Sequence, residues 1–433
     1  MNLRKTALSL LLEWEERRTY INIAVTAAAE GLPDRDRAFL VSLVYGTVER
    51  VLTLDYLIGA LSKRSPKDIR PPLRNALRLG LYQILYLSGV ADHAAVNETV
   101  KLGKNTGEKS FLNGVLRAAL RQKDSLPFPA KEKNPDRYLS VLYSVPLWIV
   151  KRFRQDFGEE TEELLAAINA PKPLCLRTNT ASISRDELLR KLLAAGIDAR
   201  PTPSAPHGIL IENAPAPTRI PGFAEGEFWV QDEASQIATA ALGAEEGQLV
   251  LDLCACPGGK SFGAAADMNN RGRVVSYDLH PSKLPLITSG AERLGLSCIS
   301  AAPHDATERI PEWEGRADRV ICDVPCSGLG VLGKKPDLRY RDEEGILTLP
   351  ILQYSILENA ASYLKKGGVL VYSTCTLGRA ENQEIAIRFA AEHPEFAPES
   401  FTVGCHTAAG GMLMLTPHRD KTDGFFIFRL RRL

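Results

Sequence analysis

The chain has 433 residues, 45% of them hydrophobic and 24% charged, and its 53 Lys+Arg nearly balance 52 Asp+Glu. This composition excludes a disordered chain and predicts a globular protein with two or three domains. No apolar run reaches the length of a membrane span, and the eight cysteines lack the spacing of a disulfide scaffold. We therefore expect a protein of the reducing cytoplasm with no membrane partner.

Charge is unevenly distributed along the chain. Residues 1–124 hold 19 Lys+Arg and 13 Asp+Glu, a net +6, which leaves −5 for the remainder. A basic segment of this kind is typical of binding to an anionic macromolecule. A solvated charged surface is an equally good interpretation.

The first 125 residues are predicted to form an all-α bundle. The stretch Met1–Glu16 repeats its apolar residues with helical spacing and is interrupted by acids, which favours a folded helix over a signal peptide. Apolar residues recur at the same spacing in 35–46 and 72–86. Turns are expected at Gly31–Pro33, at 70–72 and at Gly89.

Three segments of this helical part resemble the NusB-type RNA-binding domain. They are Leu54-Asp-Tyr56, Ala94-Ala-Val-Asn-Glu98 and Phe111-Leu-Asn-Gly-Val-Leu-Arg117. The spacing of their apolar residues alone indicates no more than buried helix faces. The resemblance implies that this part of the chain binds RNA.

A small α+β module is predicted to follow a Pro- and Lys-rich linker at 126–137. Strand character appears in Pro173–Thr178 and Gly208–Glu212. Between them, Ser184-Arg-Asp-Glu187 is a capping box that begins a helix, which Gly196 ends. We expect a βαβ-like (RRM-like) arrangement that either feeds substrate to the next domain or is a structural adaptor.

A strand-turn-helix pattern begins the last 200 residues. The apolar run Val250–Leu253 is followed by Cys254-Ala-Cys-Pro-Gly-Gly-Lys260 and a helix-like segment at 262–268. Such a turn forms a cofactor pocket in α/β sheets because small residues let backbone N–H groups approach a ligand. A phosphate-binding P-loop would need glycine at Cys254, and no Gly-x-Gly-x-x-Gly is present. An ordinary strand-to-helix turn is a second interpretation.

Acidic residues follow the next three strand-like runs, at Asp278, Asp305 and Asp323. Asp278 lies 20 residues past Gly258, the position at which a ribose diol is bound in such folds. One acid of this kind is often only a helix cap, but a row of them outlines one crevice. The pattern predicts a Rossmann-like domain with an adenosine ligand, and we expect S-adenosylmethionine. We expect no metal, because no second Cys/His pair accompanies Cys254 and Cys256 at zinc spacing.

Two thiols follow neighbouring strands of this domain. Cys326 comes after the strand that ends at Asp323, and Cys375 comes after the next strand. Free cysteine is usually a small buried hydrophobe, as we expect for Cys322, but these two lie in loops, where functional groups concentrate. We predict that at least one of them is catalytic. The segments 412–418 and 424–430 are expected to close the sheet as a hairpin.

Methyl transfer to cytosine C5 is a reaction in which both thiols could take part. C5 is a poor nucleophile until a thiolate adds at C6, after which H5 must leave and the thiol must be eliminated. One cysteine would attack, the other would assist release, and Asp323 would contact the base. The attacking group must be a thiolate, and the cytosine must be unpaired or flipped out. Spacing alone does not say which cysteine attacks.

The chain resembles the RNA 5-methylcytosine methyltransferases over nearly its whole length, and its NusB-like part makes it similar to the bacterial subgroup that methylates 16S ribosomal RNA. The motifs that carry this resemblance are Cys254-Ala-Cys-Pro-Gly-Gly-Lys260, Asp323-Val-Pro-Cys326, Ser373-Thr-Cys375 and, upstream, Gln231-Asp-Glu-Ala-Ser235.

The resemblance implies a role for each residue of these motifs. Cys375 is the nucleophile and Cys326 the release residue, with Asp323 and Lys260 in the active site. The implied ligands of S-adenosylmethionine are Cys254, Ala255, Cys256, Pro257, Gly258, Gly259, Lys260, Asp278, Asp305 and Asp323.

Three positions depart from that family. Cys256 stands where alanine is usual, Gly333 where arginine is common, and Gln383 where glutamate often follows Glu381-Asn382. The first is expected to narrow the cofactor turn and the second to remove a phosphate contact. Basic residues expected either to contact phosphates or to form a solvated surface are Lys334, Lys335, Arg339, Arg341 and Arg379.

We therefore expect three domains: an all-α NusB-like bundle with its linker (1–138), a small α+β module (139–235) and an α/β Rossmann-like class I methyltransferase (236–433). The expected function is methylation of a cytosine at C5 in 16S ribosomal RNA. We expect a monomer that acts on an unassembled or partly assembled small subunit and does not bind DNA. The alternatives are another RNA such as tRNA, a non-catalytic RNA-binding assembly or antitermination factor, and a P-loop nucleotide hydrolase.

Overall fold

The computed structural model describes residues 2–17 and 21–433. The chain divides into two compact units. Unit 1 comprises Met1–Asn169 and Leu332–Arg341, and unit 2 comprises Ala170–Val331 and Asp342–Leu433. The chain therefore leaves unit 2 after Val331, contributes ten residues to unit 1 and returns at Asp342.

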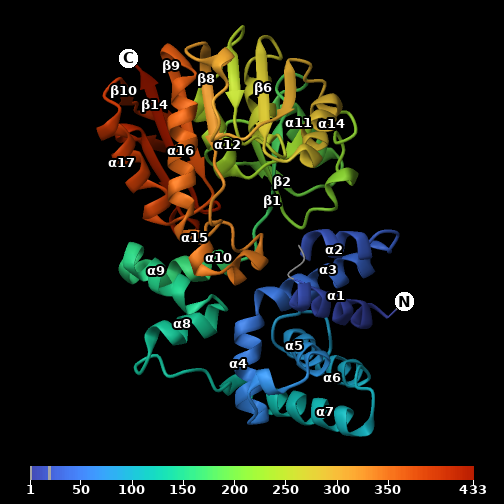
Figure 1. Cartoon of the computed structure of the whole chain (residues 1–433). Coiled ribbons are helices and arrows are strands. Elements are labelled where there is room, and N and C mark those ends of the chain that lie inside the picture. The colour runs from blue at the N-terminus through green and yellow to red at the C-terminus, as the bar shows by residue number, and fades with distance from the viewer. Residues whose placement is uncertain (1, 18–20) are drawn as a thin grey trace. The chain divides into compact units, whose positions relative to one another are not determined.

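Unit 1 is all-α in its described residues, as the sequence predicts (Figure 1). Its α-helices are α1 (Leu3–Arg17), α2 (Ile21–Ala28), α3 (Asp34–Glu49), α4 (Val51–Ser62), α5 (Pro71–Leu85), α6 (Asp92–Val100), α7 (Thr106–Arg121), α8 (Pro135–Tyr143), α9 (Leu147–Phe157) and α10 (Thr161–Asn169). The predicted N-terminal helix is confirmed from Leu3 onward, and Met1 lies outside the described residues.

Helix α5 joins the two hydrophobic cores of this unit. Leu79 packs with buried residues of α1, α2 and α3, whereas Leu77 and Leu81 pack with those of α4, α6 and α7. Helix starts follow the expected capping chemistry: the Asn105 side chain accepts a hydrogen bond from the backbone N–H of Glu108 at 3.0 Å. The all-α bundle is thus built around one central helix.

Unit 2 contains a small four-stranded sheet in the order β2-β3-β1-β4, formed by β1 (Leu174–Thr178), β2 (Ala199–Pro201), β3 (Gly208–Ile211) and β4 (Phe228–Val230). Helix α11 (Arg185–Ala194) begins at the predicted Ser184–Glu187 capping box. The expected βαβ-like (RRM-like) arrangement is confirmed in split form: α11 leads from β1 to β2, and β3 lies between these two strands and pairs antiparallel with both. Strands β2 and β4 were not predicted, because three residues carry too little periodicity to be seen in sequence.

The larger sheet has eight strands in the order β10-β14-β9-β8-β5-β6-β7, with β13 paired to β14. The strands are β5 (Leu249–Asp252), β6 (Arg273–Asp278), β7 (Ile299–Pro303), β8 (Ala317–Asp323), β9 (Leu364–Thr374), β10 (Phe396–Pro398), β13 (Met412–Leu415) and β14 (Phe425–Arg432). Strands β5 to β9 run parallel and β14 pairs antiparallel with β9 and β13, so the predicted C-terminal hairpin is confirmed.

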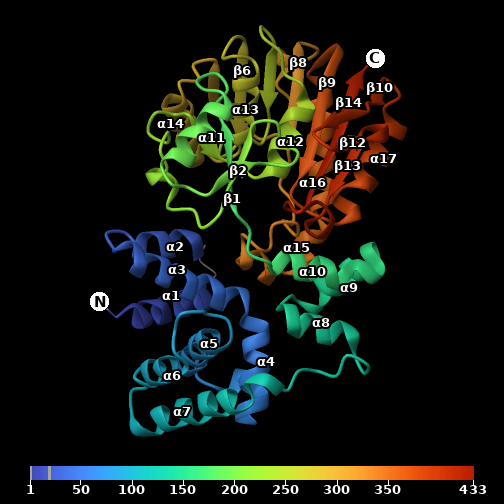
Figure 2. The same cartoon turned by 180° about the vertical axis from the view of Figure 1, so that it is seen from behind.

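Helices cover both faces of this sheet (Figures 1 and 2). One face carries α12 (Glu233–Leu242), α13 (Gly259–Asp267) and α14 (Leu284–Leu294), and the other carries α16 (Leu349–Ser362) and α17 (Gln383–Glu392). Alternate strand residues serve alternate faces: Val250 packs in the first core and Leu251 in the second. Apolar residues on both sides explain why these strands are continuous hydrophobic runs.

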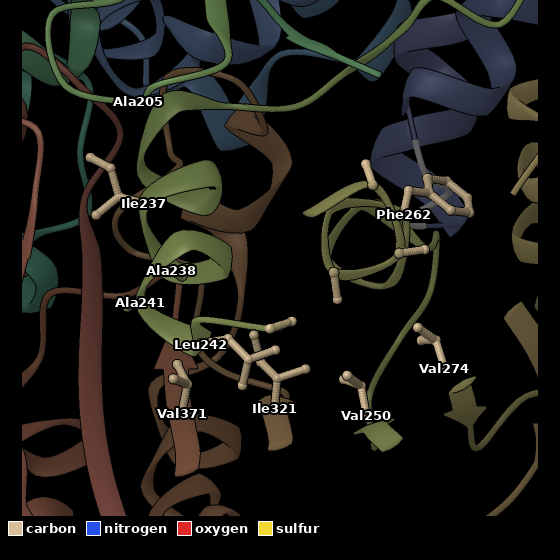
Figure 3. Close-up of a cluster of buried hydrophobic side chains, with 14 of the residues drawn as sticks. Ala205, Ile237, Ala238, Ala241, Leu242, Val250, Phe262, Val274, Ile321 and Val371 are labelled. Carbon is tan, nitrogen blue, oxygen red and sulfur yellow. The ribbon is translucent and has the colours of Figure 1, made fainter. Parts of the chain in front are cut away.

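Figure 3 shows the first of these cores from one side. Ile237, Ala238 and Leu242 of α12 lie above Ile321 and Val371 of the central strands, and all five are buried. The alanines of α12 and α13 let these helices approach the sheet closely. This packing fixes the strand-to-helix turn that follows β5.

Strands β11 (Phe401–Val403) and β12 (His406–Ala408) form a separate two-stranded sheet. Among the described residues, no helix combines the length and apolar character needed to cross a bilayer. The division into three domains at 138/139 and 235/236 stays a prediction.

Candidate active site

The candidate site lies at the carboxyl ends of the parallel strands, where β5, β6 and β8 finish at Asp252, Asp278 and Asp323. Strand β5 pairs with both β6 and β8, so the connection direction reverses beside it. Ligands bind α/β sheets at such a switch point. The row of acids predicted from sequence is therefore brought to one edge, next to the turn after β5.

Gly258 gives this turn its shape. Its φ of +111° lies in the region that favours glycine, and an added Cβ would come within 2.4 Å of the Phe262 ring. The backbone N–H of Gly258 donates to the Ala255 carbonyl at 2.6 Å, and that of Ala255 donates to Tyr277 on β6 at 2.8 Å. Pro257 and Gly259 complete the turn, and α13 begins at Gly259.

Asp278 and Asp305 are half-buried carboxylates next to this turn. Asp278 accepts hydrogen bonds from the backbone N–H of Cys256 at 3.3 Å and of His280 at 3.0 Å. Asp305 follows β7 and accepts from the hydroxyl and backbone N–H of Thr307, which lower the pKa of its carboxyl. Both side chains keep acceptor oxygens at the end of the sheet where a ligand would bind.

The cysteines of the turn are poor candidates for reactive groups. Burial raises the pKa of the Cys254 thiol well above its ordinary value, and burial together with Asp278 raises that of Cys256. Among the described residues, neither thiol belongs to a cluster of possible metal ligands. They contribute to the turn through their backbone.

Lys260 and Asp323 form an ion pair at the switch point. Lys260 Nζ lies 2.6 Å from Asp323 Oδ2, and the two side chains are 9% and 30% exposed. The ammonium group also donates to Ser235 Oγ at 3.0 Å, and Ser373 donates to Asp323 Oδ1 at 2.8 Å. The upstream Gln231–Ser235 motif thus reaches the site through Ser235, and Asp323 is held from two sides.

The two loop thiols predicted from sequence lie together. The Sγ atoms of Cys326 and Cys375 are 3.3 Å apart. The hydrogen bond with Cys375 and burial raise the pKa of Cys326 well above its ordinary value, with Glu381 and Asp323 adding to the effect. Cys326 therefore keeps its proton, and the S–H group is available to donate to Cys375. Cys322 is buried within β8, as expected.

Two buried acids at this edge were not anticipated as site residues. Asp252, at the end of β5, accepts from Ser261 at 2.7 Å, and burial raises the pKa of its carboxyl to about 6. Glu381, directly before Asn382, is fully buried between the two thiol loops. A strand-end position could have pointed to Asp252, but nothing in the spacing of Glu381 connects it with Cys326.

The expected role of Arg339 in phosphate contact is wrong. Its side chain is fully buried in unit 1 and donates to the backbone carbonyls of Glu49, Tyr143 and Ser144 and to Asn169 Oδ1. The remaining basic residues of the set, Lys334, Lys335, Arg341 and Arg379, are exposed.

Gly333 is explained by packing within unit 1. An added Cβ would come within 2.3 Å of the Ile168 carbonyl oxygen. A larger residue at this position would require the backbone to move, so close packing against Ile168 explains the glycine.

Comparison with known proteins gives three matches in chain order. Residues 1–121 match the NusB family, residues 145–217 match the ferredoxin-like domain of RsmF/B-like methyltransferases, and residues 239–431 match the 16S rRNA methyltransferase RsmB/F family. These matches confirm the expected fold class of NusB-like bundle, α+β module and methyltransferase domain.

Full-length relatives agree. The chain is 37% identical to the probable ribosomal RNA small subunit methyltransferase B of Bacillus subtilis, over 100% of this chain and 99% of the relative. It is 32% identical to ribosomal RNA small subunit methyltransferase B of Klebsiella pneumoniae, over 99% of this chain and 98% of the relative. The crystal structure of PH0851 superposes with a TM-score of 0.81 at 25% identity, covering 100% and 98%. The chain belongs to the RsmB/F family of 16S rRNA methyltransferases.

Proposed function

We propose that this protein transfers a methyl group from S-adenosylmethionine to C5 of a cytosine in 16S ribosomal RNA, through a covalent bond between a cysteine and C6. The observation that carries the proposal is the 3.3 Å separation of Cys326 and Cys375 beside the Lys260–Asp323 pair. Family membership supports RNA methylation, and the thiol pair supports the choice of C5.

The turn and acids fit an adenosine cofactor. Residues Cys254–Gly259 offer a small-residue turn at a strand end, and Asp278 and Asp305 offer carboxylate acceptors at the next two strands. Cys254 occupies the position where a triphosphate-binding loop needs glycine, which favours S-adenosylmethionine over ATP. Bound here, S-adenosylmethionine would supply an electrophilic methyl group.

Cys375 is proposed as the nucleophile. Because Cys326 retains its proton and can donate it in a hydrogen bond, a negative charge on the Cys375 sulfur is stabilised at short range. The thiolate would form the S–C6 bond and push the C5–C6 electron pair toward C5. C5 would then take the methyl group that bound S-adenosylmethionine supplies, the sulfonium S–CH₃ bond breaking with its electron pair left on the departing thioether sulfur. Asp323, held by Lys260 and Ser373, contacts the base during this step.

Cys326 is proposed to assist release. Once C5 carries the methyl group, a base would take H5 as a proton, the C5–H electron pair would restore the C5–C6 double bond, and the S–C6 bond would break with its electron pair returning to the Cys375 sulfur. Cys326 lies close enough to that sulfur to take part in this elimination. The 16S ribosomal RNA is proposed to be recognised before or during assembly of the small subunit. The protein is proposed to act as a monomer.

Methyl transfer to ribosomal RNA tests the proposal. Purified protein is incubated with 16S ribosomal RNA and S-adenosylmethionine labelled in the methyl group, and the RNA is digested to nucleosides. The proposal predicts label in 5-methylcytidine. Label in another nucleoside would reject the C5 chemistry, and label only when tRNA is supplied would reject the substrate. RNA binding without any transfer would favour an assembly factor, and preference for ATP would favour a nucleotide hydrolase.

A further inference from the structure

A buried carboxylate connects the two thiol loops. Glu381 lies in the short 3-10 helix η8 (Arg379–Glu381) before α17, and its side chain is fully buried. Its Oε2 atom accepts hydrogen bonds from the backbone N–H of Ser327 at 2.9 Å and from Gln353 Nε2 at 3.0 Å. Its Oε1 atom accepts from Ser327 Oγ at 2.6 Å and from Thr376 Oγ1 at 3.4 Å.

These partners adjoin the two thiols. Ser327 follows Cys326 and Thr376 follows Cys375 in the chain, and their hydroxyl oxygens are 2.6 Å apart. Gln353 of α16 also donates to the Pro325 carbonyl at 2.9 Å, on the other side of Cys326. One carboxylate thus bonds to residues of both loops, within one residue of each sulfur-bearing position.

The position of Glu381 itself is fixed by β9. The Tyr372 hydroxyl donates to the Glu381 carbonyl at 2.7 Å. The neighbouring Asn382 accepts from Thr374 Oγ1 at 2.6 Å and donates to the Thr376 carbonyl at 3.0 Å. The backbone around Glu381 is therefore bonded to β9, the strand before Cys375, and the Glu381 carboxylate connects the Cys326 loop to it.

The two oxygens of the carboxylate face different kinds of partner. Oε2 faces the two N–H donors, and Oε1 faces the two hydroxyls, which can donate or accept. Glutamine of the same shape can keep its carbonyl against the N–H donors and donate its NH₂ group to the hydroxyls, so it removes the charge and retains the connection. Leucine has no acceptor, and the buried donors of Ser327 and Gln353 would then move apart, because an unsatisfied buried polar group is costly.

We propose that Glu381 is a positioning residue that holds the Cys326 and Cys375 loops at the separation needed for attack and release. The inference rests on the proposed function, since it assigns to Glu381 the geometry on which covalent methyl transfer depends. Glu381 need not touch RNA or cofactor in this role.

The charge of Glu381 gives a readout that a purely structural residue would lack. The ionisable groups that act on the Cys326 thiol are Cys375 and Tyr372 of the β9 side, Asp323 of β8 and Glu381. A negative charge nearby disfavours a thiolate, so Glu381 raises the pKa of Cys326. Replacing the carboxylate by an amide should lower that pKa.

The test compares Glu381→Leu and Glu381→Gln with Glu384→Gln, which changes an exposed glutamate three residues further along the chain. We expect Glu381→Leu to lower kcat about 100-fold, the loss typical of a misplacement near 1 Å, with unchanged KM for RNA and for S-adenosylmethionine. Glu381→Gln, which removes only the charge, should keep most of the wild-type kcat. In Glu381→Gln the pH midpoint for iodoacetamide modification of Cys326, followed by peptide mass spectrometry, should move to lower pH. Glu384→Gln should match the wild type in both.

Two further variants keep the inference testable. Glu381→Asp retains the charge but shortens the reach, so kcat should fall while the Cys326 pH midpoint stays near that of the wild type. Ser327→Ala removes two hydroxyl contacts without changing charge, and serves if Glu381→Leu does not fold. Wild-type kcat in both Glu381→Leu and Ser327→Ala would overturn the inference. Absence of transfer by the wild-type protein would instead reject the proposed function.

Discussion

The sulfur atoms of Cys326 and Cys375 lie 3.3 Å apart although 49 residues separate them in the chain. The proximity follows from topology, because β8 and β9 are parallel neighbours and each thiol lies just beyond the end of its strand. Cys375 is the largest cause of the raised pKa of Cys326. The neighbouring thiol therefore does most to keep Cys326 protonated.

Removing Cys375 should make Cys326 more acidic. In Cys375→Ala the hydrogen-bond partner and the competing thiol are gone, so the pH midpoint for alkylation of Cys326 should move to lower pH. Peptide mapping after iodoacetamide treatment across pH measures it. Cys256→Ala, which removes a thiol from the turn between β5 and α13, should leave the pH midpoint for Cys326 alkylation unchanged. An unchanged or higher midpoint in Cys375→Ala would contradict the pairing.

Asp252 should make stability depend on pH. Burial raises its pKa from 3.8 to about 6, so the folded chain keeps a proton that the unfolded chain has released. This contribution is fully present below about pH 4 and is lost as the pH rises through about 6, a change of about 3 kcal/mol. Asp252→Asn should abolish this loss, as urea unfolding at several pH values would show.

Asp305 should show the opposite pH dependence of stability to Asp252, because its pKa is shifted in the other direction. Its pKa is lowered by hydrogen bonds from Thr307, so its contribution is present at neutral pH and is lost in acid as the pH falls through the folded pKa. The stability difference between Asp305→Asn and the wild type should therefore disappear at low pH. Parallel pH profiles for the Asp252 and Asp305 variants would contradict both assignments.

Gly258 should tolerate no side chain. Alanine there combines a φ of +111° with a contact of 2.4 Å to the Phe262 ring. Gly247, at φ +81° with nothing within 4 Å of an added Cβ, isolates the backbone cost. We expect about 1 kcal/mol for Gly247→Ala and about 2–4 kcal/mol for Gly258→Ala in denaturant unfolding. S-adenosylmethionine binding by calorimetry should weaken only in the Gly258 variant; equal effects would contradict the steric account.

Arg339 should stabilise unit 1. Its guanidinium donates to carbonyls of α3 and α8 and to the Asn169 side chain at the end of α10. Arg339→Ala should cost about 3 kcal/mol, because several buried acceptors lose their donor. Hydrogen exchange should accelerate in α3 and α8, whereas alanine at the exposed Lys335 should change neither stability nor exchange. Wild-type exchange in Arg339→Ala would contradict this role.

The sequence predicted those parts of the fold and site that depend on local pattern. The buried parallel strands are continuous apolar runs, and their ends are marked by Asp278, Asp323 and the glycine turn, so the strand ends could be located in advance. The strands β2 and β4 were missed because three residues carry no usable period.

Residues whose surroundings come from distant parts of the chain were the hardest to predict. Arg339 lies in a basic loop sequence, which is typical of phosphate contact, but its acceptors are backbone carbonyls up to 290 residues away. Glu381 was seen only as part of a family pattern, since its hydrogen bond to Ser327 spans 54 residues. Burial of such charged side chains depends on tertiary contacts and leaves no local pattern.

The most direct test of covalent methyl transfer compares Cys375→Ala with Cys326→Ala on 16S ribosomal RNA and labelled S-adenosylmethionine. Methyl incorporation and a protein–RNA adduct that survives denaturant are measured together. We predict that Cys375→Ala loses both, and that Cys326→Ala accumulates the adduct because release fails. If the adduct disappears only in Cys326→Ala, then Cys326 is the nucleophile and Cys375 the release residue. Methylation unaffected by either change would contradict covalent catalysis by these thiols.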